Sequence, residues 1–343
     1  MSSDDHQHLM TFEKSPERLV SLVPSITASL YDLDFADRIV GVTDFCPQPP
    51  GAENPIPTVG GPRDPSIEEI LALKPDLVLA NQEENRREAV EQLETAGVAV
   101  WVSFPCSVDQ AIEMLWAVLR IIPSASQATN KLLVLERSLE WARRSAEDQR
   151  AIPVFYPIWT DQYYGKPWFM TIHSNTYAHS VLQVCGARNI FAERERRYPL
   201  EADLGLCQPE APGERDCRYP RVTLEEVCNR SPELILLPDE PYAFTPEHTG
   251  RIQELLQDTP AAQTGSIHII DGRLVHWHGT TLAKTLLELP LVIRGTHRRK
   301  KYKTWGFLLT LRFRIAINLR SLKIYARGWH LLLREGRDGN PGS

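Results

Sequence analysis

The sequence predicts an α/β protein of two lobes, each built on a mostly parallel sheet, joined by one long α-helix and separated by a cleft. Three observations carry this prediction. Short apolar runs alternate with helical segments in both halves of the 343-residue chain. A long helical window without Gly or Pro divides the halves, and a unit of helix and buried strand occurs once in each half.

Residues 1–122 are assigned to the first lobe. An apolar run over 18–23 ends at Pro24 and predicts a strand, and Ser25 is expected to cap a helix over 26–33. The run over 76–80 is nearly all apolar, which suits a parallel sheet covered on both faces. The other elements expected here are strands over 38–42 and 98–102 and helices over 67–73, over 85–96 and after Ser107.

Residues 123–150 are expected to form the connecting helix, because Leu132, Leu135 and Leu139 give it an apolar stripe. About 25 helical residues span about 40 Å, enough to run along both lobes. The second lobe, 151–293, repeats the alternation of strands and helices. Within it, the segment from about 194 to 221 has no periodicity, so we predict a surface insertion that is partly mobile.

The tail over 294–343 is strongly basic, with 13 Lys and Arg against 2 Asp and Glu, although the whole chain has a net charge of −6. Apolar and polar residues alternate over 311–319, as in a strand. One interpretation is a segment that adheres to an anionic membrane or nucleic acid. The alternative, which we prefer, is an appended stretch outside the fold. No nucleic-acid partner is therefore expected.

The internal repeat pairs residues 66–80 (SIEEILALKPDLVLA) with residues 223–237 (TLEEVCNRSPELILL). In both, a hydroxyl N-cap, an aliphatic residue and two glutamates begin a short helix, and a proline and an acid lead into a buried strand. Helix capping explains each feature separately, but not the occurrence of the whole unit once per lobe. Two similarly built lobes predict a cleft at their strand ends, where open α/β sheets bind ligands.

Targeting signals and paired cysteines are missing from the sequence as it stands. The first 20 residues have no basic and apolar leader, and no run of about 18 apolar residues is long enough for a membrane helix. We expect a cytoplasmic protein from this sequence, or a periplasmic one if the start is misassigned. The six cysteines form no CxxC pair, which favours free thiols.

Several segments resemble the class III (helical-backbone) periplasmic binding proteins of iron-siderophore, haem and cobalamin ABC importers. The resemblance covers about residues 17–292 and is carried by RLVSLVPS at 18–25, VGVT at 40–43, ALKPDLV at 72–78, SPELILL at 231–237 and DGR at 271–273. It implies a monomeric solute-binding protein whose lobes hold a corrinoid or metal chelate. It also implies that Glu68 and Glu225 dock on arginines of an importer's membrane subunits.

Polar and aromatic side chains follow two strands of the first lobe. Phe45 and Cys46 follow the second strand, where Phe45 could stack on a flat ligand and Cys46 could make a soft contact. The alternative is a stiff turn with a buried thiol. Asn81, Glu83 and Glu84 follow the third strand and could grip ligand hydroxyls, or could simply begin the next helix.

The second lobe contributes aromatic candidates. Trp159 and Trp168 are flanked by polar residues, Gly and Pro, as in loops, and are predicted to form cleft walls, whereas core packing is the alternative for Tyr156 and Phe169. Tyr242 follows a buried strand and is a candidate by the same logic. We also expect Trp277 and His278 to line the cleft.

A metal site is the main alternative function. In a strand, His276 and His278 would share a face and could reach one ion, as in a metal carrier or a metal-dependent enzyme. No further ligands can be identified, so we expect no bound metal or cofactor. No nucleophile elbow, Walker A loop or HExxH motif occurs, and we predict that the protein is not an enzyme. A cytoplasmic ligand sensor with the same fold is the remaining alternative.

Overall fold

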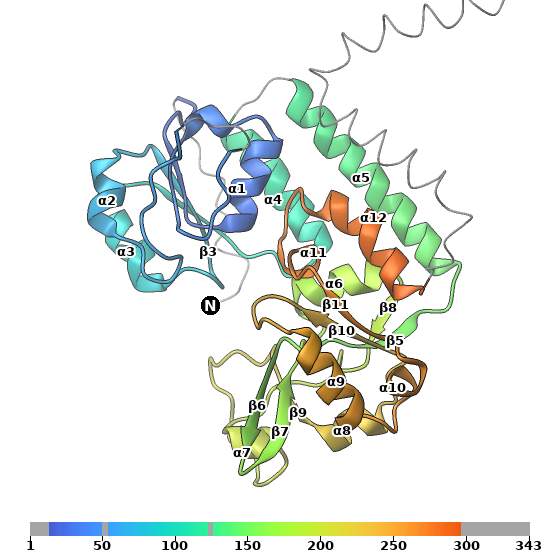
Figure 1. Cartoon of the computed structure of the whole chain (residues 1–343). Coiled ribbons are helices and arrows are strands. Elements are labelled where there is room, and N and C mark those ends of the chain that lie inside the picture. The colour runs from blue at the N-terminus through green and yellow to red at the C-terminus, as the bar shows by residue number, and fades with distance from the viewer. Residues whose placement is uncertain (1–13, 50–53, 123–125, 296–343) are drawn as a thin grey trace, which may run out of the picture. The chain divides into compact units, whose positions relative to one another are not determined.

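The first sheet is a four-stranded parallel sheet with the order β2-β1-β3-β4 (Figure 1). The computed structural model describes residues 14–49, 54–122 and 126–295. The first-sheet strands are β1 (Leu19–Ser21), β2 (Ile39–Val42), β3 (Leu77–Asn81) and β4 (Val100–Ser103). The side chains of β3 are buried along its whole length, as its apolar sequence predicts for a strand covered on both faces.

The helices of this lobe are α1 (Pro24–Asp32), α2 (Ile67–Ala72), α3 (Arg87–Thr95) and α4 (Val108–Ile121), with a 3₁₀ turn over Ala36–Arg38. Ser107 caps α4 as expected, accepting a hydrogen bond from the Gln110 N–H. The prediction for Ser25 is wrong. Helix α1 begins two residues earlier than expected, at Pro24, whose missing N–H makes it a favourable first helical residue. The Ser25 hydroxyl is thus free to bond elsewhere.

The predicted connecting helix is α5 (Ser126–Glu147), a helix of 22 residues. Its buried face consists of Ala128, Leu132, Leu135, Leu139 and Ala142. The helix packs against α4 of the first lobe and against α6 and α12 of the second (Figure 1). It therefore contacts both lobes, as its predicted length suggested.

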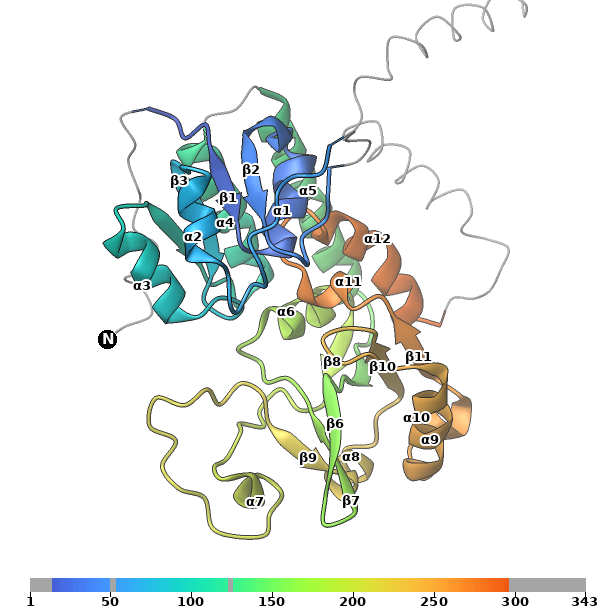
Figure 2. The ribbon, with the colours of Figure 1, turned by 60° about the vertical axis from the view of Figure 1, so that its left-hand side comes forward.

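The second lobe contains a parallel sheet with the order β11-β10-β5-β8 and a small antiparallel sheet with the order β6-β7-β9 (Figure 2). Their strands are β5 (Ile152–Phe155), β6 (Trp159–Tyr163), β7 (Lys166–Met170), β8 (Ala187–Asn189), β9 (Arg221–Thr223), β10 (Leu234–Pro238) and β11 (Ile267–Ile270). The helices are α6 (Tyr177–Val184), α7 (Leu200–Asp203), α8 (Leu224–Asn229), α9 (Pro246–Leu255), α10 (Pro260–Thr264), α11 (Arg273–His276) and α12 (Leu282–Ile293).

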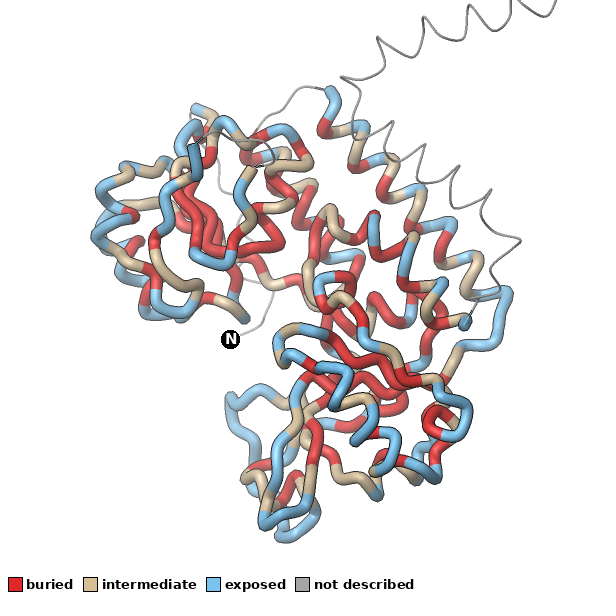
Figure 3. Tube along the Cα trace, in the orientation of Figure 1, coloured by how far each residue is buried: buried red, intermediate tan, exposed pale blue. Residues whose placement is uncertain are grey.

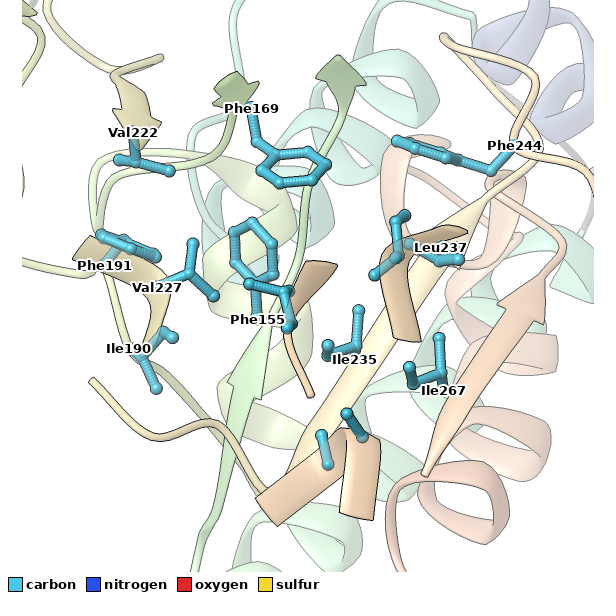
Figure 4. Close-up of a cluster of buried hydrophobic side chains, with 14 residues drawn as sticks. Phe155, Phe169, Ile190, Phe191, Val222, Val227, Ile235, Leu237, Phe244 and Ile267 are labelled. Carbon is cyan, nitrogen blue, oxygen red and sulfur yellow. The ribbon is translucent and has the colours of Figure 1, made fainter. Parts of the chain in front are cut away.

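The core of the second lobe forms where its two sheets meet. Phe155 lies at the centre, with its ring edge-on to Phe169 of β7 at 5.4 Å and to Phe191 at 5.7 Å (Figure 4). Aliphatic residues of β10 and β11 complete the cluster. The strands of the two parallel sheets are mostly buried, whereas no residue of β6 is buried (Figure 3). Through this cluster the small sheet is fixed on the parallel sheet.

The segment over 194–221, predicted as a surface insertion, is exposed over 205–216 and has buried polar contacts at its ends. The Arg194 guanidinium is buried and pairs with Asp203 at 2.9 Å and Glu226 at 3.0 Å. Asp203 also accepts hydrogen bonds from the N–H groups of Arg197 and Arg221. A buried ion pair is stable only when its remaining hydrogen bonds are satisfied, as they are here. These bonds anchor both ends of the segment.

The repeated unit has similar helix starts in both lobes. Ser66 accepts a hydrogen bond from the Glu69 N–H at the start of α2. Thr223 and Glu226 form a reciprocal capping box at the start of α8. The Glu226 side chain thus bonds back to its N-cap, whereas the first glutamate of each pair, Glu68 or Glu225, is exposed in the first helical turn.

Inter-residue contacts divide the chain into two units, 1–297 and 298–343, and all described residues belong to the first. The strand-like pattern over 311–319 lies outside the described residues. None of the described helices is long and apolar enough to cross a membrane. All six cysteines are free thiols.

Candidate functional site

A cavity of about 880 Å³ lies between the lobes. The first lobe lines it with Pro24, Arg63, Phe104 and the turn after β3, and the second lobe with residues that follow β5, β10 and α11. The carboxyl ends of β1, β3 and β4 lead into the cavity, as expected for a ligand site of open α/β sheets. The second-lobe lining residues are Ile158, Met170, Asp216, Arg218, Tyr219, Glu240, Pro241, His276 and Trp277.

An adjoining hollow of about 560 Å³ extends this cavity along the first lobe. The two share Arg63, Glu83, Glu84 and Pro241, and the adjoining hollow adds Phe45, whose side chain is 72% exposed. An exposed aromatic ring beside a cavity is available to stack on a flat ligand. Phe45, Glu83 and Glu84 therefore lie together, as the strand-end argument predicted.

A charged contact spans the cavity rim. Glu83 of the first lobe accepts hydrogen bonds on Oε1 from Arg218 at 2.8 Å and from the Tyr219 hydroxyl at 2.7 Å. Arg218 also binds Asp216 at 2.7 Å, and its guanidinium lies 4.8 Å from the centre of the Phe104 ring. Both lobes thus meet at the rim through polar side chains that remain partly open to solvent.

Two carboxyl groups within the cavity have raised pKa values. Burial, together with the charges of Glu83 and Glu240, raises the pKa of Glu84 to about 7. Burial and the nearby Asp239 raise the pKa of Glu240, which lies on the second lobe. In both groups the charged form is disfavoured by burial and by neighbouring carboxyl groups.

His276 and Trp277 face the cavity from the second lobe. The His276 Nε2 atom lies 3.0 Å from the buried Tyr156 hydroxyl. Burial lowers the pKa of His276 to about 4, so the imidazole is neutral near pH 7. The guanidinium of Arg273 lies 5.8 Å from the centre of the Trp277 ring. Trp277 thus places an aromatic ring in the lining of the cavity.

His278 does not line the cavity, which corrects the prediction. The His278 ring is buried, with Nδ1 3.2 Å from the Ser25 hydroxyl and Nε2 3.4 Å from the Asn81 side-chain nitrogen. Because an amide nitrogen can only donate, Nε2 accepts and Nδ1 carries the proton. Burial lowers the pKa of His278 to about 4, so this cross-lobe contact is neutral.

The following residues continue this contact between the lobes. Thr280 donates from its N–H to Ser29 and from its hydroxyl to Asp32, both on α1. Gly279 has φ +97°, and a Cβ there would lie 2.2 Å from the Ser29 hydroxyl oxygen. The backbone of 279 therefore approaches α1 closer than any side chain would allow.

The metal alternative depended on His276 and His278 sharing the face of a strand. His276 instead ends helix α11, and the two imidazoles bind different partners on different sides. Among residues 14–49, 54–122 and 126–295, no group of three or more His, Cys, Asp or Glu side chains is placed to hold a metal ion. The sequence pattern was misread because a helix and a turn replace the expected strand.

Two first-lobe side chains that we predicted to face the ligand are buried away from the cavity instead. Cys46 is buried, and its sulfur lies 3.0 Å from the Thr43 hydroxyl and 3.1 Å from that of Thr27. Asn81 is also buried, where it supports His278 and accepts a hydrogen bond from the Glu83 N–H. Neither side chain lines the cavity. They support the surrounding structure instead.

The second-lobe aromatic predictions also change. Trp168 is only 7% exposed because β7 is the central strand of its sheet, so it belongs to the core. Trp159, on the edge strand β6, is exposed and packs edge-on against Tyr242 at 5.1 Å. Tyr242 lines a separate hollow of about 310 Å³ with residues of β6, β7 and α9. Neither Trp159 nor Tyr242 lines the cavity between the lobes.

Several lining residues were missed from the sequence. Phe104 follows β4 and Glu240 follows β10, so the strand-end argument could have found both. Arg218 and Tyr219 belong to the segment over 194–221. Its sequence has no periodicity and did not indicate where in the fold it would lie. Only the fold of the second lobe brings them opposite Glu83.

Known proteins resemble the chain in sequence and in fold. A sequence model of the periplasmic binding protein family matches residues 19–274. The vitamin B12-binding protein of Yersinia pestis (strain Pestoides F) is 28% identical over 225 residues, which are 65% of this chain and 70% of that protein.

Solved structures share the fold. The periplasmic heme-binding protein RhuT from Roseiflexus sp. RS-1 aligns with a TM-score of 0.64 and 20% identity, over 81% of this chain and 98% of that one. The periplasmic vitamin B12 binding protein BtuF of Vibrio cholerae aligns with a TM-score of 0.63 and 19% identity, over 84% and 99%. With the family match spanning most of the two-lobed fold, the chain belongs to the periplasmic binding protein family.

Proposed function

We propose that this protein captures a cobalamin-like or iron-chelate ligand between its lobes and delivers it to an ABC importer. The observation that carries the proposal is the cavity of about 880 Å³ bounded by strand ends of both lobes. Cavities of this size suit ligands of several hundred daltons or more. The vitamin B12-binding and haem-binding relatives make large cyclic ligands the first class to test.

The lining side chains support binding rather than catalysis. Phe45, Phe104 and Trp277 supply aromatic surfaces, and the carboxyl groups beside them accept hydrogen bonds. The proposal includes no chemical step on the ligand. Family membership also favours the periplasmic alternative for its location.

Docking to membrane subunits is assigned to Glu68 and Glu225. Both are exposed in the first turns of equivalent helices, α2 and α8, one in each lobe. An arginine on each half of a symmetric partner could pair with one of these carboxylates and orient the protein.

Direct binding measurements test the ligand class. Cyanocobalamin, haemin and ferrichrome are titrated into the purified protein by calorimetry and by quenching of tryptophan fluorescence. We expect at least one dissociation constant below ~100 μM, which corresponds to more than ~5 kcal/mol of binding free energy. Trp277→Ala should weaken that binding at least about tenfold, a loss of ~1.4 kcal/mol. Weaker binding of every probe would reject the ligand class.

Docking is tested separately. The double variant Glu68→Arg/Glu225→Arg should keep ligand affinity but lose binding to the importer of the same organism reconstituted in nanodiscs. Glu94→Arg/Glu254→Arg is the matched control, because both residues are exposed on helices, one in each lobe. Equal binding by both double variants would reject the assignment.

A further inference from the structure

Charged side chains in the cavity are mostly acidic. Four carboxyl groups line it, against two guanidinium groups. The acids come from both lobes, so a ligand held between them meets negative charge on each side. The acidic residues are Glu83, Glu84, Asp216 and Glu240, and the basic residues are Arg63 and Arg218.

Arg218, the basic residue nearest the rim, is already neutralised by two partners. Its guanidinium binds Glu83 at 2.8 Å and Asp216 at 2.7 Å, and its face lies over Phe104. An anionic ligand would have to displace a carboxylate to reach this charge. Its desolvation and the loss of the existing pair would oppose such an exchange.

Glu84 and Glu240 lie on opposite lobes. A further negative charge placed between them would be repelled by both carboxyl groups. The two carboxyl groups interact unfavourably with each other, and Glu83 and Asp239 add to the effect. A ligand carboxylate or phenolate between them would meet the same repulsion. A ligand N–H or a positive charge would relieve it, because such a group stabilises the ionised form of both carboxyl groups, which accepts hydrogen bonds only.

Apart from the Gln82 amide, the rest of the lining is apolar or aromatic. Pro24, Ile158, Met170 and Pro241 join Phe104 and Trp277 around the same cavity. Such walls suit a broad apolar body, while the acids suit donors at its edge.

We infer that the ligand is neutral or cationic, with a broad apolar body and amide or other N–H donors at its periphery. This inference rests on the proposed function and narrows its ligand class. It favours a corrinoid, whose edge carries carboxamides, or a cationic hydroxamate chelate. It disfavours haem, which carries carboxylates at its edge, and polyanionic iron chelates.

The test compares ligands that differ only in their edge groups. Cyanocobalamin is compared with its carboxylate derivative, in which peripheral amides are hydrolysed, and haemin with its diamide. The amide form of the preferred scaffold should bind at least about tenfold more tightly than its acid form. The preference should grow as ionic strength falls, because screening weakens at low salt.

Variants link the preference to the cavity. In Glu84→Gln/Glu240→Gln, which keeps the side-chain shapes, the ratio between amide and acid forms should fall at least about threefold. Glu94→Gln on the exposed face of α3 is the control and should leave the ratio unchanged. Circular dichroism and a thermal unfolding curve establish that each variant is folded.

The possible failures are distinguishable. If an acid form binds as tightly as its amide partner, or more tightly, the inference is overturned and the proposed function stands. An amide preference that is unchanged in Glu84→Gln/Glu240→Gln also overturns it. If no ligand of either kind binds, the proposed ligand class fails, and this inference fails with it.

Discussion

The lobes meet in two places that differ in chemistry. At the inner junction, His278 and Gly279 pack on α1 through buried, neutral groups, and the half-buried Thr280 donates to Ser29 and to the Asp32 carboxyl group. At the rim, Glu83 and Arg218 form an ion pair with side chains that are 32% and 19% exposed. A buried neutral contact is costly to open because each group loses its partner, whereas a rim ion pair can exchange with water.

This difference indicates how the lobes could admit a ligand. We expect the inner junction to stay in place and the rim contact to open. Helix α5 would also keep the junction in place, because it packs against helices of both lobes. Substitutions at the two contacts should therefore differ in how much they change the free energy of unfolding.

The largest effect is expected from Gly279→Ala. The new Cβ would meet the Ser29 hydroxyl in a backbone conformation with φ +97°, and the inner junction would have to move. We expect a loss of at least about 3 kcal/mol in the free energy of unfolding, measured by urea denaturation. Gly97→Ala is the matched control, because its φ of +84° is similar and nothing lies within 4 Å of the new Cβ. Equal losses in the two variants would contradict a close junction.

A smaller effect is expected from the protonation of His278. Its folded-state pKa of about 4 lies below the ordinary value of 6.5, so its contribution is complete above pH 6.5 and is lost as the pH falls towards 4. We expect a loss of about 2 kcal/mol across this window, measured by urea denaturation at several pH values. His276 titrates in the same direction. His278→Gln should therefore reduce the slope by about half, and an unchanged slope would count against a buried neutral His278.

Glu84 should have the opposite pH dependence. Its folded-state pKa of about 7 lies above the ordinary value of 4.5, so its contribution is complete below pH 4.5 and is lost as the pH rises through 7. At pH 8 we expect Glu84→Gln to be more stable than the parent by about 1–2 kcal/mol, and at pH 4.5 the two should be similar. Thermal unfolding at both pH values measures this. Greater stability of the parent at pH 8 would contradict the prediction.

The smallest effect on stability is expected at the rim. Glu83→Gln should change the free energy of unfolding by less than about 1 kcal/mol, because the ion pair is partly solvated. It should nevertheless increase the radius of gyration measured by X-ray solution scattering, since the rim would open more often. Glu94→Gln should leave the scattering unchanged. A large stability loss without a change in scattering would reverse the assigned roles of rim and junction.

Family resemblance and strand-end logic together located the cavity but not every side chain in it. Phe45, Glu83 and Glu84 lie beyond strand ends, whereas Trp277 lies beyond helix α11. Cys46 failed because proximity to a strand end does not fix the direction of a side chain. Trp168 failed because the sequence does not show that β7 is a central strand.

The sequence by itself determined the local elements of this protein, including the strands, the caps of α2, α4 and α8 and the long helix α5, because these depend on neighbouring residues. Only the tertiary structure decided that Ser25 meets His278 across 253 residues and that Arg218 meets Glu83. Such pairs depend on how whole sheets and loops pack. No local pattern of polar residues specifies which of them will become partners.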